Sequence, residues 1–154
     1  MPPPINKKPN DFTPVIGAIN LADYVITITD NINKFPDCIA KEKKMPDGSI
    51  AQIYIQRQDS LTNWAREQAK QIFMLAYTAN MINVQRQPGR REERLKRQLK
   101  AIALCEEHLA AIQLCRKHFK LSSGKVKHWG GMTLAVKAAI EGWHESDKRR
   151  YRAP

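Results

Sequence analysis

Residues that could hold a metal ion gather in one stretch of the chain. Cys105 and His108 form a Cys-x-x-His pair, and Cys115 and His118 form a second pair ten positions later. A helix rises about 1.5 Å per residue, so the two pairs stand about 15 Å apart, whereas the ligands of one zinc ion lie within about 2.3 Å of it. The sequence therefore predicts no metal site and no bound cofactor, and it assigns these side chains to packing.

Patterns that would indicate catalysis are also missing from the sequence. The chain shows no phosphate-binding loop and no Ser, His and Asp arrangement, and the adjacent Glu106 and Glu107 point to different faces of a helix. Trp64, Trp129 and Trp143 have rings that could stack on bases, but tryptophans at seam positions of a helix are more often core anchors. We therefore expect a protein that is not an enzyme.

Positive charge is the strongest chemical signal in the sequence. Twenty-six Lys and Arg against fifteen Asp and Glu give 26 − 15 = +11. Residues 1–83 carry 9 basic and 8 acidic side chains, so residues 84–154 carry 17 and 7, a net charge of +10. Clustered Lys and Arg gain binding free energy by displacing counterions from phosphate backbones, which predicts a polyanionic partner. A solubilising surface is the alternative.

Length and composition place this charge on one soluble domain. The 154 residues, 42% of them apolar, are enough for one core. The longest nearly apolar run, 72–82, is too short to cross a bilayer, and the amino terminus has no apolar signal core. Three cysteines without framework spacing favour reduced thiols, so we expect a cytoplasmic protein with no membrane segment.

Prolines, glycines and apolar spacing predict the elements that carry the charge. Residues 1–17 hold five prolines and a glycine and are expected to form an extended Pro-rich N-terminal arm. A polar loop is expected over 36–49, and the helices over 18–35, 50–86, 90–119 and from Ser122 or Ser123 onward. Short final connections favour an all-α fold, an antiparallel up-and-down four-helix bundle over residues 18–152.

Apolar spacing also predicts which side chains face the core. The last helix carries a seam with steps of 3, 4, 3, 4 and 3, typical of bundle packing, at Val126, Trp129, Thr133, Val136, Ile140 and Trp143. Trp64, Gln68 and Ile72 are expected inward on the helix over 50–86, and Leu95, Leu99 and Ile112 on the helix over 90–119.

Alternate loops of an up-and-down bundle lie at the same end, so the arm, the loop after residue 86 and the carboxyl terminus should meet. Segment 86–100 has a net charge of +5 and segment 148–154 of +4, or 5 + 4 = +9 together. Arginine forks match phosphate oxygens, which favours recognition of backbone and shape. The predicted nucleic-acid contacts are Arg86, Arg90, Arg91, Arg94, Arg97, Lys100, Lys148, Arg149 and Arg150. A second group of basic residues is expected at the opposite end of the bundle. It consists of Arg116, Lys117, Lys120, Lys125 and Lys127, with Lys41, Lys43 and Lys44 nearby.

A second surface is expected on the outward side of the last helix. Small residues there would let another backbone approach closely, and glycines inside an exposed helix otherwise cost about 1 kcal/mol each. We expect a subunit interface between this stripe and the outer side of the helix over 50–86. Its residues are Phe73, Tyr77, Gly131, Ala135, Ala138 and Gly142. The alternative is that the alanines favour helix and the glycines are tolerated.

Several short motifs between about residues 47 and 151 carry a family resemblance. They are Ala79, Asn80, Asn83 and Arg86; Arg90, Arg91 and Arg94; Leu109, Ile112, Gln113 and Leu114; 126–130; and 143–148. In these motifs the chain resembles the small four-helix-bundle family that includes the accessory variability determinants of diversity-generating retroelements. Proteins encoded within intervening sequences of bacterial 23S ribosomal RNA genes share that fold. The motifs at 126–130 and 143–148 favour the retroelement branch.

The resemblance implies a homopentamer that binds nucleic acid and an error-prone reverse transcriptase. Such a protein is not itself an enzyme. It supports copying of a template RNA into mutated cDNA. By position, the contacts to nucleic acid or polymerase would be Arg86, Arg90, Arg91, Arg94 and Arg97. Alternatives are a protein of the ribosomal intervening-sequence type and a structural interaction module whose basic rim docks an acidic protein.

Overall fold

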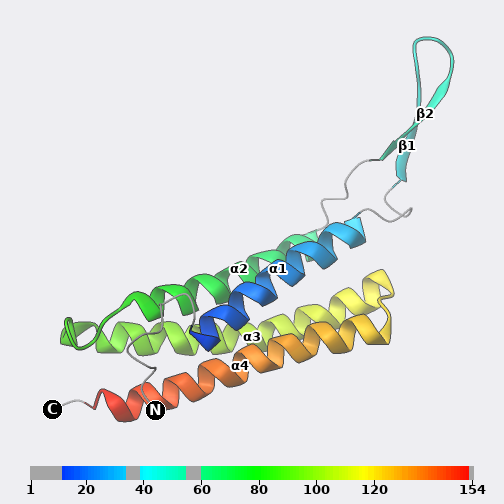
Figure 1. The fold of residues 1–154 in the computed structure, drawn as a ribbon. Coiled ribbons are helices and arrows are strands. Elements are labelled where there is room, and N and C mark those ends of the chain that lie inside the picture. The colour runs from blue at the N-terminus through cyan, green and yellow to red at the C-terminus, as the bar shows by residue number, and fades with distance from the viewer. Residues whose placement is uncertain (1–11, 34–38, 55–59, 153–154) are drawn as a thin grey trace.

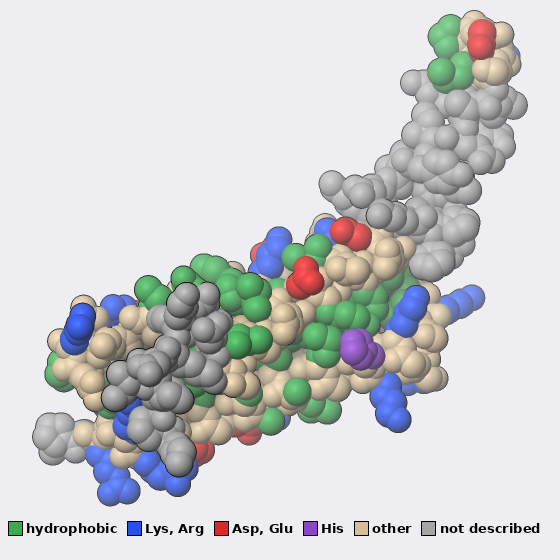
Figure 2. Space-filling model, viewed as in Figure 1, with side chains coloured by type: hydrophobic (Ala, Val, Ile, Leu, Met, Phe, Trp, Pro, Cys, Tyr) green, Lys and Arg blue, Asp and Glu red, His purple; other side chains and the backbone are tan. Residues whose placement is uncertain are grey.

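The fold is seen in a computed structural model that describes residues 12–33, 39–54 and 60–152. Four long helices make up most of it. They are α1 (Thr13–Asn33), α2 (Ser60–Met81), α3 (Arg91–Phe119) and α4 (Ser123–Arg150), with strands β1 (Ile39–Lys44) and β2 (Ile50–Tyr54) between α1 and α2 and a short 3-10 turn, η3 (Pro88–Arg90), before α3. The helices lie along one another in an elongated body (Figure 1), and Lys and Arg side chains on the face shown in Figure 2 lie mostly towards its ends.

Contacts between helices define a closed four-membered ring. Packing joins α1 to α2, α2 to α3, α3 to α4 and α4 back to α1, so α2 and α4 are diagonal. Consecutive helices run in opposite directions (Figure 1). Arg94 near the start of α3 accordingly bonds Asp147 near the end of α4, while Glu106 further along α3 pairs with Lys137 earlier in α4. The predicted four-helix bundle is confirmed for the described residues.

A β-hairpin replaces the loop predicted over 36–49 and the first part of the helix predicted over 50–86. The prediction was wrong there because a segment without proline or glycine was assigned wholly to helix, although β-branched and aromatic residues favour strand over 50–54. The turn is made by Pro46, Asp47 and Gly48, whose φ of +88° suits glycine. Asp47 accepts bonds from the Ser49 N–H and hydroxyl, which closes the turn.

The first helix begins earlier than predicted, so the extended arm proposed for 1–17 is wrong for residues 13–17. Pro14 fits the first helical turn, where its missing N–H has no intrahelical acceptor. A Cβ at Gly17 would come within 3.4 Å of Val136 Cγ2, so glycine allows α1 to lie close to α4. Residues 1–11 of the predicted arm lie outside the described residues.

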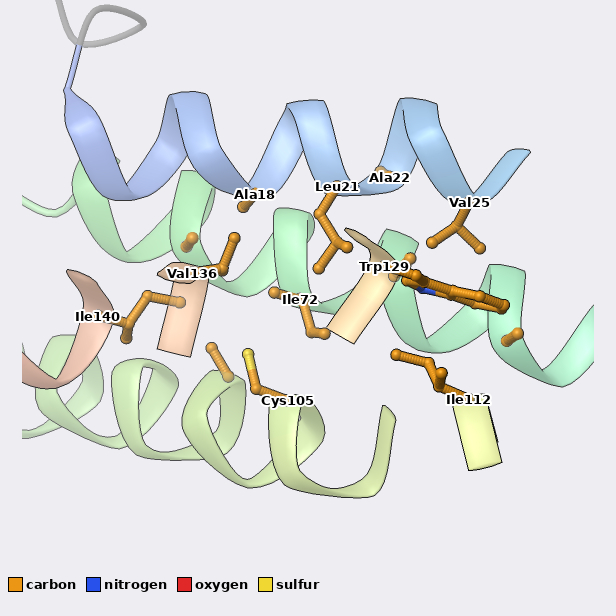
Figure 3. Close-up of a cluster of buried hydrophobic side chains, with 14 of the residues drawn as sticks. Ala18, Leu21, Ala22, Val25, Ile72, Cys105, Ile112, Trp129, Val136 and Ile140 are labelled. Carbon is orange, nitrogen blue, oxygen red and sulfur yellow. The ribbon is translucent and has the colours of Figure 1, made fainter. Parts of the chain in front are cut away.

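Small side chains line much of the core, which explains where the predicted inward positions were wrong. All six seam residues of α4 are buried, as predicted. Trp64 and Leu99, also predicted inward, are 42% and 52% exposed. On α2 the predicted inward residues Gln68 and Ile72 are buried. The rest of the buried line is mostly small residues such as Ala65, Ala69 and Ala76, so the bulky Trp64 does not mark it. Figure 3 shows Leu21, Ile72, Cys105, Ile112 and Trp129 converging between the helices.

Candidate nucleic-acid interface

Three segments distant in sequence meet at one end of the bundle, which we call the arginine end: the loop after α2, the start of α3 and the end of α4. The Arg91 side chain on α3 donates to the backbone carbonyl of Tyr151, directly after α4. Arg94 joins the same two helices through Asp147. The predicted cationic residues of 86–100 and 148–152 are therefore close together. Glu145 and Asp147 are also present, which lowers the predicted net charge to 9 − 2 = +7.

Arg94 is a structural residue, so its prediction as a nucleic-acid contact is wrong. Its Nε donates to Asp147 Oδ2 at 2.7 Å and its Nη1 to the Ile82 carbonyl at 2.8 Å. Its side chain is only 9% exposed, that of Asp147 2%, and Gln98 Nε2 donates to the same carboxylate at 2.6 Å. One guanidinium thus ties the end of α2 to α3 and α4 and has no group left for phosphate.

Carboxylates also compensate three neighbouring arginines. Arg90 donates from two nitrogens to the two oxygens of Glu93, at 2.9 and 3.0 Å, and Arg97 donates to Glu93 at 2.7 Å. Hydrogen bonds from both arginines lower the pKa of Glu93 to about 2, and the bond to Glu93 raises the pKa of Arg90. Arg91 pairs with Glu92. These three predicted contacts lie at the arginine end, but each of them is already paired with a carboxylate.

Six other cations at this end are exposed and, within the part of the chain that the structure describes, are in no ion pair. They are Arg86, Lys96, Lys100, Arg149, Arg150 and Arg152. Arg150 lies over the Tyr151 ring, 5.2 Å from its centroid, and Lys148, also exposed, pairs with Glu145 at 3.3 Å. Lys96 and Arg152 were not among the predicted contacts, although their place in the same basic segments was a signal for them. These six side chains are the cations of the arginine end that are best placed to contact phosphate.

The predicted interface residues of α4 lie on the surface. Gly131, Ala135, Ala138 and Gly142 are all exposed, and a Cβ built on either glycine meets nothing within 4 Å. On α2, Tyr77 is 40% exposed. Phe73 is partly buried, with its ring centroid 5.6 Å from that of Tyr77. Because α2 and α4 are diagonal, these two surfaces face opposite sides of the bundle, an arrangement suited to head-to-tail contacts.

A neutral polar cluster lies inside the other half of the bundle. His108 is fully buried, contacts Gln68 Oε1 through Nδ1 at 3.0 Å and accepts the Trp129 indole N–H on Nε2 at 3.0 Å. Burial lowers the pKa of His108 to about 4, so the ring is neutral at pH 7. Trp129 is a core residue, as predicted.

The neighbouring thiol is equally inert. Burial raises the pKa of Cys105 to about 12. No group of three or more His, Cys, Asp or Glu residues that could hold a metal ion occurs in the described ranges. None of the four helices is both long and apolar enough to cross a membrane.

Comparison with family models, curated proteins and solved structures finds no match to this chain. Its chemistry must therefore be inferred from its own surface.

Proposed function

We propose that this protein is a non-catalytic nucleic-acid-binding accessory protein that assists an error-prone reverse transcriptase. In this role it supports mutagenic cDNA synthesis from a template RNA in a diversity-generating retroelement, and it acts in the cytoplasm. The observation that carries the nucleic-acid part is the group of six exposed cations at the arginine end that form no ion pair with any described residue. The polymerase part rests on the sequence resemblance.

The chemistry of the arginine end suits a phosphate backbone. Four of the six cations are arginines, whose planar forks bind phosphate oxygens with two parallel hydrogen bonds. They are spread over three segments, so a strand crossing this end can meet several of them at once. Backbone contacts of this kind position a nucleic acid without reading its bases.

Binding to a single-stranded RNA oligonucleotide tests this assignment. Arg149→Gln/Arg152→Gln removes two charges, and each lost phosphate contact lowers the slope of log affinity against log salt by about 0.7, or about 1.4 for two. Lys70→Gln/Lys137→Gln is the control for the charge removed, because it takes away two cations, each paired with a glutamate, from the middle of the bundle. Equal salt slopes for the two variants, with helicity retained, would refute binding at the arginine end.

We further propose that the protein assembles as a homo-oligomer, a pentamer by the family resemblance, through the α4 stripe and the outer side of α2. Gly131→Ala/Gly142→Ala separates this role from helix stability. In the monomer both methyl groups have space, so the helix gains about 1 kcal/mol per site. At a close interface they push the subunits apart. Light scattering should show a smaller assembly for a variant that melts no earlier; an unchanged mass would reject the interface.

Copying assays test the polymerase role. Adding the protein to the reverse transcriptase and template RNA should raise the yield of mutated cDNA, and Arg149→Gln/Arg152→Gln should raise it less.

A second candidate function is docking of an acidic protein. It is favoured by exposed apolar side chains near the arginine end: Tyr77 and Met81 on α2 are 40% and 60% exposed. Such a partner would bind the protein while RNA failed to bind at low salt.

A further inference from the structure

We propose that the turn between α3 and α4 is a second contact for nucleic-acid phosphates, at the opposite end of the bundle from the arginine end. This inference rests on the proposed nucleic-acid-binding function and adds a site to it. The residues are Arg116, Lys117, Lys120 and Lys127, which we call the turn cations. They occupy the last turn of α3, its C-cap and the second turn of α4.

The turn cations are exposed and uncompensated. Each of the four is exposed, and none is in an ion pair with any residue of 12–33, 39–54 or 60–152. The sequence contains no Asp or Glu between Glu107 and Glu141. At the arginine end, by contrast, Glu92 and Glu93 follow directly on the first arginines. The turn cations therefore keep their charge, and like charges so close together repel unless a polyanion binds.

Lys120 indicates that stability alone does not determine these residues. It caps α3 in the left-handed conformation, with φ 52° and ψ 47°. Glycine is the usual residue at this position, because the Cβ of other residues crowds the backbone there. The lysine side chain makes a positive tip at the turn instead. Its position is better explained by what the turn binds than by the capping of α3.

The surroundings favour a phosphate backbone over an acidic protein. Protein interfaces usually have an apolar centre and few lysines. Next to the turn cations, Phe119 and Leu121 are partly buried, and Leu114 is the one large apolar side chain of 114–129 that is strongly exposed, at 53%. The hairpin stands at this same end (Figure 1), and its exposed residue Lys44 is a further cation there. Between residues 114 and 129, the surface therefore offers several charges and little apolar contact.

Salt-dependent RNA binding tests the second contact. Lys117→Gln/Lys127→Gln removes one charge from each side of the turn, and Lys70→Gln/Lys137→Gln removes two from the middle of the bundle. With a single-stranded RNA oligonucleotide between about 50 and 200 mM salt, the turn variant should show a slope smaller by about 1.4 and an affinity about tenfold lower, with the control unchanged. Identical binding by the two variants would overturn the second contact.

Comparison with Arg149→Gln/Arg152→Gln separates this proposal from the function on which it rests. Loss of affinity in that variant alone would overturn the second contact and leave the proposed function standing. Loss in the turn variant alone would support the second contact and reject binding at the arginine end. No binding of RNA by the unmodified protein at about 50 mM salt would overturn both. Binding of polyglutamate, but not RNA, through the turn cations would assign the turn to an acidic protein and overturn the proposal.

Lys120→Gly gives a second readout that a purely structural turn would not produce. Glycine relieves the crowding at the left-handed C-cap, so the melting temperature should rise. RNA affinity should fall at the same time because one charge is lost. A variant that is more stable and binds RNA as well as the unmodified protein would contradict a binding role for Lys120.

Discussion

The two ends of the bundle use their positive charges differently. At the arginine end, Arg94 is buried on Asp147 and holds three helices together, and Arg90 and Arg97 share Glu93. At the turn end, the turn cations are exposed and form no ion pair with the described residues. In the same half of the bundle, Arg66 of α2 pairs with Asp30 of α1, and the buried cluster around His108 is neutral. The end with more basic residues thus commits several of them to structure. Charge counted along a sequence overstates the charge that a partner can reach when carboxylates are interleaved with it.

Removing Arg94 gives the largest expected effect and tests whether the arginine end is structural. Arg94→Ala leaves Asp147 buried without its partner, which costs about 3–5 kcal/mol of unfolding free energy. Urea denaturation measures this loss. Arg86→Ala, on an exposed side chain at the same end, should change stability by less than about 0.5 kcal/mol. Equal stabilities of the two variants would mean that Arg94 does not hold the helices together.

Acid should destabilise the half of the core that lies nearer the turn between α3 and α4. Burial lowers the pKa of His108 to about 4 from its ordinary 6.5, so between these values the unfolded chain binds a proton that the folded chain does not. Its contribution to stability is therefore complete above pH 6.5 and decreases as the pH falls to about 4, by about 3 kcal/mol in all.

The variant His108→Gln isolates this contribution, because an amide keeps hydrogen-bonding capacity without titrating. Denaturation midpoints measured between about pH 4 and 7 should fall less steeply for the variant than for the unmodified protein. Other groups that titrate in acid are common to both proteins and cancel in the comparison. Parallel pH profiles would show that His108 is not buried in the neutral form.

Releasing Arg90 and Arg97 from Glu93 should have the smallest effect of these changes. It should make the two ends of the bundle more alike, because both would then carry cations without a paired carboxylate. Glu93→Gln removes the carboxylate that Arg90 and Arg97 share, so RNA affinity should rise by a few-fold and the salt slope should increase by about 0.7 for each new phosphate contact. The exposed residue Glu107, in the middle of α3, gives the matched control Glu107→Gln. Equal RNA affinities of these two variants would show that pairing with Glu93 does not keep Arg90 and Arg97 from binding RNA.

Sequence periodicity predicted the parts of the fold that depend on one helix at a time. The seam of α4 was predicted because its large residues recur at heptad-like steps. Its start was predicted at Ser122 or Ser123, and the structure assigns the N-cap to Ser122, which accepts the Lys125 N–H at 3.3 Å. The hairpin was missed although Pro46 and Gly48 are typical turn residues, because the segment after them was assigned to a helix. The buried line of α2 is rich in alanine, which also occurs on exposed helix faces. The spacing of alanines therefore did not show that Trp64 lies on the surface.

The candidate site depends on distances between helices, which spacing alone does not provide. The pairing of Arg90 and Arg97 with Glu93 follows from intervals of three and four on one helix and was open to prediction. The bond between Arg94 and Asp147 joins residues 53 positions apart and requires the register of α3 on α4. For the same reason, the burial of Arg94 was visible only in the folded chain.

The salt dependence of RNA affinity for the variant Lys117→Gln/Lys127→Gln/Arg149→Gln/Arg152→Gln tests the central claim most directly. If exposed cations at both ends bind phosphates, removing two from each end lowers the log–log slope by about 2.8 relative to the unmodified protein, with helix content retained. A folded variant whose slope equals that of the unmodified protein would contradict the account.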